Sequence, residues 1–232
     1  MWRIPCAYYL GRCIMDAPWP IYIDGPCIVI TFKGSAPDID IVPILYFGDP
    51  QWRGYLWDRS SSKKILTSIP LHLDFIKKRK ESQHVHFRQV IRLLKWWAIQ
   101  REQDTPGFSL RSFIIELLVA KLSDGGMRCD DYHLALEQFF TYIQRTGLRE
   151  RVSFDDNYPS SKLPPKKVHA VEIFDPVNPE NNVAAEITEA QRQKLVELAA
   201  VALDALSYAR NSQTKADALE CWRELMGASF NA

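Results

Sequence analysis

The sequence has few cysteines, almost no net charge and no long apolar run. Its five cysteines are odd in number and show no C-x-x-C spacing, which argues against a disulfide framework or a zinc cluster. They are Cys6, Cys13, Cys27, Cys129 and Cys221. We expect each of them to be a small buried apolar residue in a reducing compartment. The formal net charge of +1 provides no global field that would attract nucleic acid, so any basic surface must be local.

No apolar segment approaches the length that spans a bilayer, and residues 2–10 are too short and too polar for a secretory signal. We therefore expect a soluble, cytoplasmic protein with no membrane partner. Since 47% of the 232 residues are hydrophobic, the chain can bury a sizeable core, either in one large domain or in two small lobes.

Residues 27–47, CIVITFKGSAPDIDIVPILYF, carry the most informative pattern. Two apolar runs rich in β-branched residues, 27–32 and 39–47, flank the turn-forming residues 33–37. This pattern predicts a hairpin that is buried on at least one face. Pro43 lies inside the second run and removes a backbone donor, which predicts an edge strand or a bulge.

Asp40 is a carboxylate placed where the second run becomes continuously apolar. An ionised carboxylate in that position needs a compensating charge, hydrogen bonds or a metal. Because side chains alternate across a strand, Asp38 and Asp40 are expected on one face, together with Val42 and Ile44. The pair is interpreted either as ligands of a divalent cation or as strand-end residues that accept hydrogen bonds from turn amides.

Two segments are rich in aromatic residues without a regular period. Residues 1–20 hold much aromatic surface, and we find no upstream sequence against which it could pack. Residues 48–68 are expected to form a loop in which three aromatic residues are followed by basic residues. Such a loop can bind single-stranded nucleic acid, but packing onto its own domain is the favoured interpretation. The residues concerned are Trp52, Tyr55, Trp57, Arg59, Lys63 and Lys64.

From residue 69 onward the apolar period becomes helical. Helices are expected over 84–103, over 110–122 with Ser109 as N-cap, and over 132–145 with Gly147 as terminator. A Thr188–Gln191 capping box predicts a long helix to about residue 211, and a last helix covers 214–226. Residues 152–182 are expected to be irregular, with a short strand over 168–174. The predicted fold class is α+β, with a β-rich start followed by a helical bundle.

Two further features invite a binding interpretation that we do not favour. Residues 77–80, KKRK, form a local basic run that could meet nucleic acid or phosphate, but a solvated helix surface is preferred. His84 and His86 are two residues apart, so on a helix their side chains diverge, and we do not expect a zinc site.

Four short motifs occur in a defined order along the chain: DIVP at 40–43, RLLKWW at 92–97, SFIIELL at 112–118 and DPVNPENNV at 175–183. Together they resemble the nucleotidyltransferases of the oligoadenylate synthase and cyclic GMP–AMP synthase superfamily. The greatest similarity is to the bacterial CD-NTases of anti-phage systems. The resemblance extends from about residue 21 to the last helix.

The resemblance implies an enzyme that joins nucleoside triphosphates such as ATP or GTP into cyclic or linear oligonucleotides and releases pyrophosphate. In this family three acidic residues hold two Mg²⁺ (or Mn²⁺) ions, and Asp40 matches the third of them, as a catalytic residue and metal ligand. Lys95 matches a lysine that contacts the triphosphate, and Ser112 matches a serine with the same role. Without the resemblance, a surface lysine and a helix cap would be preferred.

The sequence departs from the family at the first two acids, which follow a Gly-Ser motif and a helical turn. Only Ala36 and Pro37 separate Ser35 from Asp38, which is too short for that turn. We therefore expect that this chain lacks the first two acids. It would then be an amino-terminally truncated enzyme or a degenerate relative.

On this interpretation residues 1–68 form a partial catalytic lobe, and residues 69–232 form the helical lobe. The alternatives are a catalytically inactive module that binds nucleotide or a partner, and a helical scaffold. A regulatory protein or the missing amino-terminal lobe is the expected protein partner.

Overall fold

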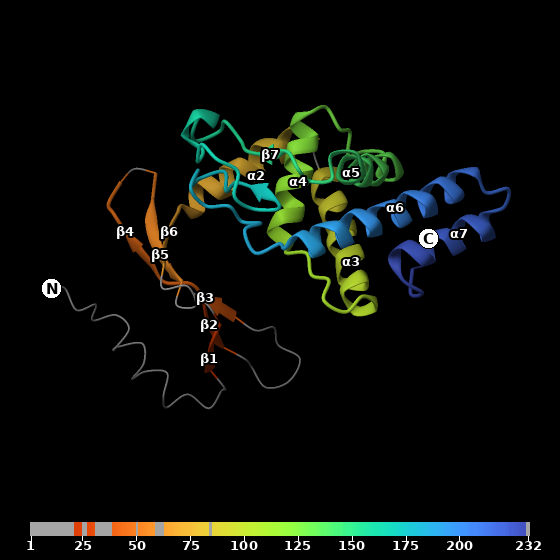
Figure 1. The fold of residues 1–232 in the computed structure, drawn as a ribbon, viewed down its shortest axis with the longest axis horizontal. Helices are drawn as coiled ribbons and strands as arrows, with labels where there is room; N and C mark the ends of the chain where they lie inside the picture. Colours follow the sequence, from red (N-terminus) through yellow and green to blue (C-terminus); the bar gives the residue numbers. More distant parts are fainter. Residues whose placement is uncertain are drawn as a thin grey trace. The chain divides into compact units, whose positions relative to one another are not determined.

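The computed structural model describes residues 21–24, 27–30, 39–49, 51–58, 63–83 and 85–230, with the backbone alone for 21–24, 27–30, Asp40 and Asp58. The chain divides into two compact units, Met1–Ile69 and Pro70–Ala232. The described part of the first unit is built from strands, and that of the second mainly from helices (Figure 1). The predicted α+β class is confirmed. The aromatic segment 1–20 and the turn 33–37 lie outside the described residues.

The first sheet contains β1 (Ile21–Asp24), β2 (Cys27–Ile30) and β3 (Ile39–Ile41), paired antiparallel in that order. Val29 of β2 lies opposite Asp40 of β3. The predicted pairing of the two apolar runs is therefore confirmed at the level of the backbone. Asp38 lies outside the described residues.

The second apolar run is not one strand, so the prediction of a continuous strand over 39–47 is wrong. β3 ends at Ile41, Val42 and Pro43 belong to no strand, and β4 (Ile44–Tyr46) pairs with β5 in a separate sheet. Pro43 has no N–H to donate, which explains why the ladder stops there. Val42 and Ile44 therefore do not continue the strand of Asp40.

The prediction of a loop over 48–68 is also wrong, because this segment contains β5 (Gly54–Asp58) and β6 (Lys63–Thr67). The two strands pair antiparallel, and Tyr55, Leu56 and Trp57 supply the large side chains that favour strands. A Cβ atom on Gly54 would lie 2.5 Å from Ile44 Cγ2, so the close approach of β4 and β5 requires a glycine.

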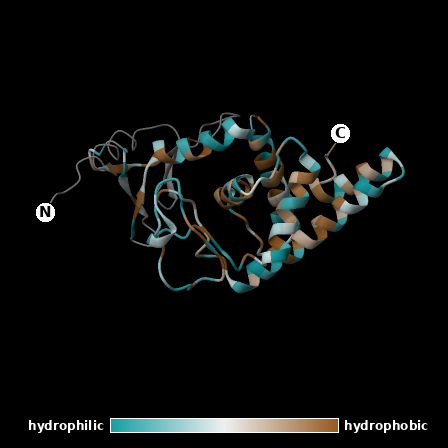
Figure 2. Cartoon of the chain, turned by 90° about the horizontal axis from the view of Figure 1, so that it is seen from above, coloured by the Kyte–Doolittle hydropathy of each residue, from teal (hydrophilic) through white to brown (hydrophobic). Residues whose placement is uncertain are grey.

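Six helices are described in the remainder of the chain, and Figure 2 shows hydrophilic and hydrophobic residues alternating along them. α6 and α7 lie side by side, with α7 folding back along α6 (Figure 1). The predicted helices from residue 84 onward are confirmed, with shifts of a few residues at their ends. The helices are α2 (Ile69–Gln83), α3 (His86–Asp104), α4 (Ser112–Asp124), α5 (Tyr132–Thr146), α6 (Glu189–Asn211) and α7 (Lys215–Met226).

The helix termini follow the predicted capping residues with one exception. Thr188 and Gln191 form the predicted capping box of α6, and Gly147 ends α5 with a φ of 55°. Ser109 is not the N-cap of α4, because that helix begins at Ser112. The preceding residues Phe108 and Leu110, which belong to no helix or strand, are both buried in the core before the helix starts.

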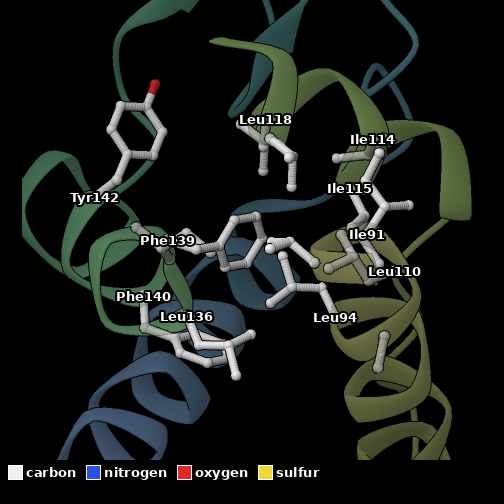
Figure 3. Close-up of a cluster of buried hydrophobic side chains, with 14 of the residues drawn as sticks. Ile91, Leu94, Leu110, Ile114, Ile115, Leu118, Leu136, Phe139, Phe140 and Tyr142 are labelled. Carbon is white, nitrogen blue, oxygen red and sulfur yellow. The ribbon is translucent and has the colours of Figure 1, made fainter. Parts of the chain in front are cut away.

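The core of the second unit lies where α3, α4 and α5 meet (Figure 3). Leu94, Leu118 and Phe139 are fully buried there, and the ring of Trp97 lies edge-on to Phe140 with centroids 4.8 Å apart. Burial also raises the pKa of the Cys129 thiol to about 11, so this cysteine is a buried apolar residue as expected.

The segment 152–182 is largely irregular, as predicted. Its regular elements are short: η1 (Ser160–Lys162) and β8 (Glu172–Ile173), the latter paired in parallel with β7 (Arg151–Val152). The predicted strand over 168–174 is thus reduced to two residues.

Asp175 organises the turn that follows β8. Its Oδ1 atom lies 2.8 Å from His72 Nε2 and accepts a hydrogen bond of 2.8 Å from the Val177 amide. Its carbonyl accepts a 2.6 Å hydrogen bond from the Tyr158 hydroxyl. Because Asp175 is buried, the contacts of its carboxylate with His72, Val177 and Asn181 supply the compensation that it needs, and the contact with His72 fixes the DPVNPENNV motif to α2.

Core packing generates the first prediction. Leu118→Ala removes a fully buried side chain, and we expect it to lower the free energy of unfolding by about 2–5 kcal/mol. Leu73→Ala is the matched control, since Leu73 is 64% exposed. Its expected cost is below about 0.5 kcal/mol. Urea titration followed by circular dichroism measures both values, and equal costs for the two variants would contradict the described core.

Candidate functional site

The three residues predicted to carry chemistry fall in different units. Asp40 lies in β3 of the first unit, whereas Lys95 lies in α3 and Ser112 in α4 of the second. The structure brings Lys95 and Ser112 to neighbouring helices. For Asp40 it gives the position of the backbone in the sheet.

Lys95 is held by an ion pair rather than lying free on the surface. Its Nζ atom lies 2.5 Å from Glu116 Oε1 on α4, and the two side chains are 30% and 26% exposed. Its neighbour Leu94 is fully buried, so the stem of Lys95 lies at the border of the core. The ammonium group is thus positioned by a carboxylate and remains accessible to solvent.

Ser112 is the exposed first residue of α4. It precedes Glu116 by four residues, so both residues lie on the same face of the helix, one turn apart. Lys95 therefore contacts α4 at Glu116, one turn towards the C-terminus from Ser112. At the start of this helix no side chain caps the backbone, and no acidic residue occupies the first turn. The first turn of α4 itself therefore supplies no carboxylate to the positive end of the helix dipole, and the N-cap residue Arg111 pairs with Glu186.

A pocket of about 320 Å³ opens beside Lys95, between α2, α3 and α4. Two arginines of α3, Arg88 and Arg92, line it together with Lys95 and Glu116. Neither arginine was identified from the sequence. The available signal was their spacing, because Arg92 lies three residues before Lys95 and Arg88 a further four, which places all three cations on one helix face. The remaining lining residues are Ile76, Gln89 and Ile91.

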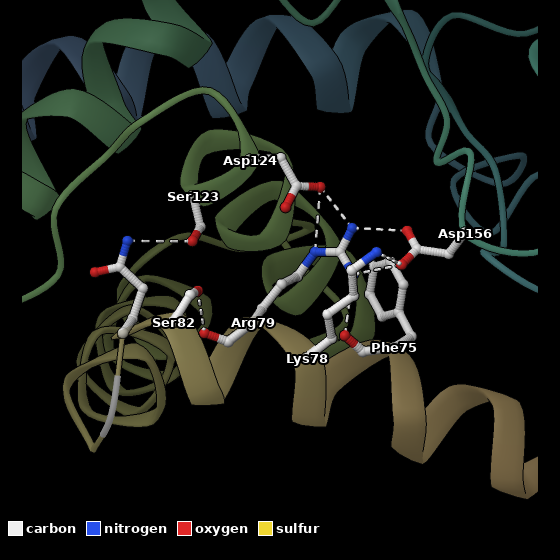
Figure 4. Close-up of polar contacts among 8 residues, drawn as sticks. Phe75, Lys78, Arg79, Ser82, Ser123, Asp124 and Asp156 are labelled. Carbon is white, nitrogen blue, oxygen red and sulfur yellow. Dashed lines mark hydrogen bonds and ion pairs between the residues drawn. The ribbon is translucent and has the colours of Figure 1, made fainter.

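The basic run 77–80 is not a purely solvated surface, so this prediction is wrong for Arg79. Arg79 is 5% exposed and lies between two carboxylates, donating to Asp124 Oδ2 at 2.5 Å and to Asp156 Oδ2 at 2.8 Å (Figure 4). Its guanidinium carbon lies 3.8 Å from the ring centroid of Phe75. Lys77 and Lys78 do remain exposed.

Lys78, Arg79, Asp124 and Asp156 form the Arg79 cluster, in which the charge of each residue depends on the others. Burial opposes ionisation of Asp156, but its hydrogen bonds and charge interactions with Arg79 and Lys78 outweigh that effect and lower its pKa. Burial likewise opposes the charge on Arg79, whereas Asp156 and Asp124 raise its pKa. The cluster is therefore an internal ion network that joins α2, the end of α4 and the irregular segment.

Within the described part of the chain, no three or more histidine, cysteine, aspartate or glutamate side chains lie together as potential metal ligands. The histidines have other neighbours. His72 contacts Asp175, His86 Nδ1 lies 2.9 Å from the Tyr132 hydroxyl, and His133 packs on Trp222. His84 lies outside the described residues.

The aromatic residues near the second sheet pack partly on one another. Tyr46 stacks on Trp52 with ring centroids 4.9 Å apart, and Lys64 lies 5.9 Å from the ring centroid of Tyr55. Trp57 of β5 and Trp52, which precedes that strand, remain exposed. Binding of nucleic acid by these residues stays the untested alternative to packing onto their own domain. None of the described helices is both long enough and apolar enough to cross a bilayer.

Comparison with known proteins gives similarity over most of the chain. No protein-family model matches it. A cyclic AMP-AMP-AMP synthase from Escherichia coli (strain MS 115-1) is 45% identical over 203 residues, which make up 88% of this chain and 63% of that protein. The chain thus spans less than two thirds of the length of this curated relative.

Solved structures agree with the sequence comparison. E. coli MS115-1 CdnC with ATP is 42% identical, with a TM-score of 0.89 over 98% of this chain and 71% of that one. CdnC in complex with HORMA-deltaN is also 42% identical, with a TM-score of 0.86 over 96% of this chain and 69% of that one.

The Arg79 cluster generates a pH-dependent prediction. Asp156→Asn removes one charge of the network, and we expect it to lower the free energy of unfolding at pH 7 by about 1–3 kcal/mol. The pKa of Asp156 is lower in the folded than in the unfolded protein, where it is about 3.9. The stabilisation that its carboxylate contributes is therefore complete above the unfolded-state pKa and is lost as the pH falls through the folded-state pKa.

The difference between wild type and Asp156→Asn should therefore shrink as the pH falls below about 4. Guanidinium unfolding at several pH values measures it. Asp155→Asn is the control, since Asp155 is the exposed neighbour in the chain. A pH-independent difference, or an equal effect of the control, would contradict this assignment.

Proposed function

The chain belongs to the CD-NTases, the bacterial nucleotidyltransferases that resemble cyclic GMP–AMP synthase, and on that basis we propose that it contributes to the synthesis of oligonucleotide messengers. The reaction would join nucleoside triphosphates into cyclic or linear products and release pyrophosphate, in a pathway of anti-phage defence. The 45% identity with a cyclic AMP-AMP-AMP synthase, over 88% of this chain, is the observation that carries the proposal. Because the chain spans 63% of that relative, the activity proposed is that of the whole protein.

In this proposal Lys95 and Ser112 bind the triphosphate. The Lys95 ammonium would neutralise charge on a phosphate oxygen, and the Ser112 hydroxyl would donate a hydrogen bond at the start of α4. Both roles are supported by the shared face of α4 that Ser112 and Glu116 occupy. Glu116 would orient Lys95 until phosphate arrives, since the two side chains are 2.5 Å apart and partly exposed.

Asp40 is proposed as one ligand of a divalent cation, Mg²⁺ or Mn²⁺. Such an ion, when bound, would align the attacking ribose hydroxyl and stabilise charge on the transferred phosphoryl group. A single carboxylate does not make such a site, and among the described residues no three histidine, cysteine, aspartate or glutamate side chains gather. Additional carboxylates would have to come from outside the described residues.

A protein partner forms part of the proposal. The related CdnC has been solved in complex with a HORMA protein. We propose that a regulatory protein of that kind binds this chain as well, and that ATP or a similar triphosphate is the substrate, as CdnC has also been solved with ATP.

The second candidate is a module that binds nucleotide or a partner without turnover. It is favoured by the lone carboxylate at position 40 among the residues that match the family's acids. The two functions differ in whether product forms from the protein carrying its native flanking sequence.

Substitution of Lys95 tests nucleotide binding. We expect Lys95→Ala to weaken ATP affinity at least about tenfold, because a charge-assisted contact to phosphate is lost. Lys77→Ala is the matched control, since the Lys77 side chain is 70% exposed and does not line the pocket. Isothermal titration calorimetry measures both. Unchanged affinity in Lys95→Ala would exclude this residue from the triphosphate site.

Substitution of Asp40 tests catalysis. In the protein with its native flanking sequence, we expect Asp40→Asn to lower turnover by at least about 100-fold while ATP affinity changes little. Chromatography of products from radiolabelled ATP measures turnover. Nucleotide binding with no product from the unsubstituted protein would instead support the binding module.

A further inference from the structure

Two arginines of the Lys95 pocket have no carboxylate partner among the described residues. Arg88 and Arg92 are exposed, and neither makes an ion pair or a hydrogen bond with another described residue. Most of the other arginines in Pro70–Ala232 are paired with a carboxylate. These are Arg79, Arg101, Arg111, Arg128, Arg149, Arg151, Arg192 and Arg210.

The charge balance of the pocket depends on these two residues. Its lining contains three cations and one carboxylate, and that carboxylate, Glu116, is 2.5 Å from Lys95. The Lys95–Glu116 pair is therefore neutral as a unit. The net positive charge of the pocket comes from Arg88 and Arg92.

The spacing of the cations suits an extended anion. Arg88, Arg92 and Lys95 lie four and three residues apart on one face of α3, so they span about 10 Å along the helix axis. A guanidinium group presents two parallel N–H donors that fit a phosphate, and it remains charged at any physiological pH. Ile76 and Ile91 add apolar wall, and Gln89 adds an amide.

The volume is consistent with one small ligand. At about 320 Å³ the pocket is at the lower end of the size range of small-molecule sites, so it would hold a single nucleotide rather than a longer chain.

We propose that this pocket is a second phosphate subsite, in which Arg88 and Arg92 bind the phosphates of a nucleotide next to the triphosphate contacts of Lys95 and Ser112. The identity of the ligand rests on the proposed function, whereas the assignment of an anion site to the two arginines rests on the geometry of α3. The phosphates would be those of a substrate nucleotide or the terminal phosphates of an oligonucleotide product.

Direct binding to the chain tests the proposal. The probes are ATP, a linear triadenylate with a 5′-triphosphate, and inorganic tripolyphosphate, titrated by calorimetry at fixed ionic strength. We expect Arg88→Gln/Arg92→Gln to weaken binding of each anion at least about tenfold. The matched control is Arg145→Gln, an exposed arginine of α5 that lines a different pocket. It removes the same charge elsewhere and should leave affinity within about twofold.

The three probes separate the sources of the phosphate. Preference for ATP over tripolyphosphate would assign a substrate nucleotide, and preference for the triadenylate would assign the product. Unchanged affinity in the double variant, or an equal loss in Arg145→Gln, would overturn the proposal. A DNA duplex serves as a fourth probe. The proposal would also be overturned if the duplex bound more tightly than the other three probes and the double variant abolished that binding. Unaltered thermal unfolding of the variant confirms that it is folded, as expected for two exposed side chains.

Failure of this inference can be distinguished from failure of the proposed function. If Lys95→Ala weakens ATP binding and the native protein forms product, but the double arginine variant binds normally, only the second subsite is wrong. If no product forms from any version while the double variant still loses anion affinity, the subsite stands and the transferase activity is wrong.

Discussion

Burial of one face of α3 determines where the cationic side chains of the second unit lie. Val90, Leu94 and Trp97 face the core formed with α4 and α5, and this fixes the rotation of the helix about its axis. Lys95 follows Leu94 directly and is therefore held at the edge of the core, within reach of Glu116. The residues that precede it on the same face, Arg88 and Arg92, lie outside the core on the wall of the pocket. Packing thus positions the charges that the proposed chemistry uses.

Arginine has two opposite roles within a short stretch of this chain. Arg79 is buried, and its charge is compensated by Asp124 and Asp156, which come from distant parts of the sequence. Arg88 and Arg92 are exposed and have no such partner among the described residues. A buried charge needs partners within the folded protein. An exposed charge is solvated by water and can bind an anion from solution. The difference lies in the surrounding carboxylates and not in the arginines themselves.

Local sequence signals predicted those elements that depend on local physics. The Thr188–Gln191 capping box, the terminator Gly147 and the apolar periodicity of α5 each act within a few residues, so the helices were predictable. The predictions failed where residues that are distant in the sequence determine the local structure. Ser109 fails as a cap because Phe108 and Leu110 are drawn into a core formed elsewhere in the chain. The second sheet was missed because aromatic residues suited a loop as well as a strand, and the partner of Lys95 was missed because Glu116 is 21 positions away. The resemblance identified Lys95 and Ser112, whereas only the structure placed Arg88 and Arg92 in one pocket with Lys95.

The network around Arg79 also restricts how this chain could be recombined with its relatives. Since Arg79 belongs to α2 while Asp124 and Asp156 lie further along the same unit, a chimera joined after Gln83 would combine these carboxylates with a foreign helix. If that helix lacked an arginine in register, two aspartates would face each other without a cation. A junction at the start of Pro70–Ala232 keeps the three residues together. α2 therefore has to be inherited with the helical unit, and exchange of the amino-terminal unit alone leaves this network intact.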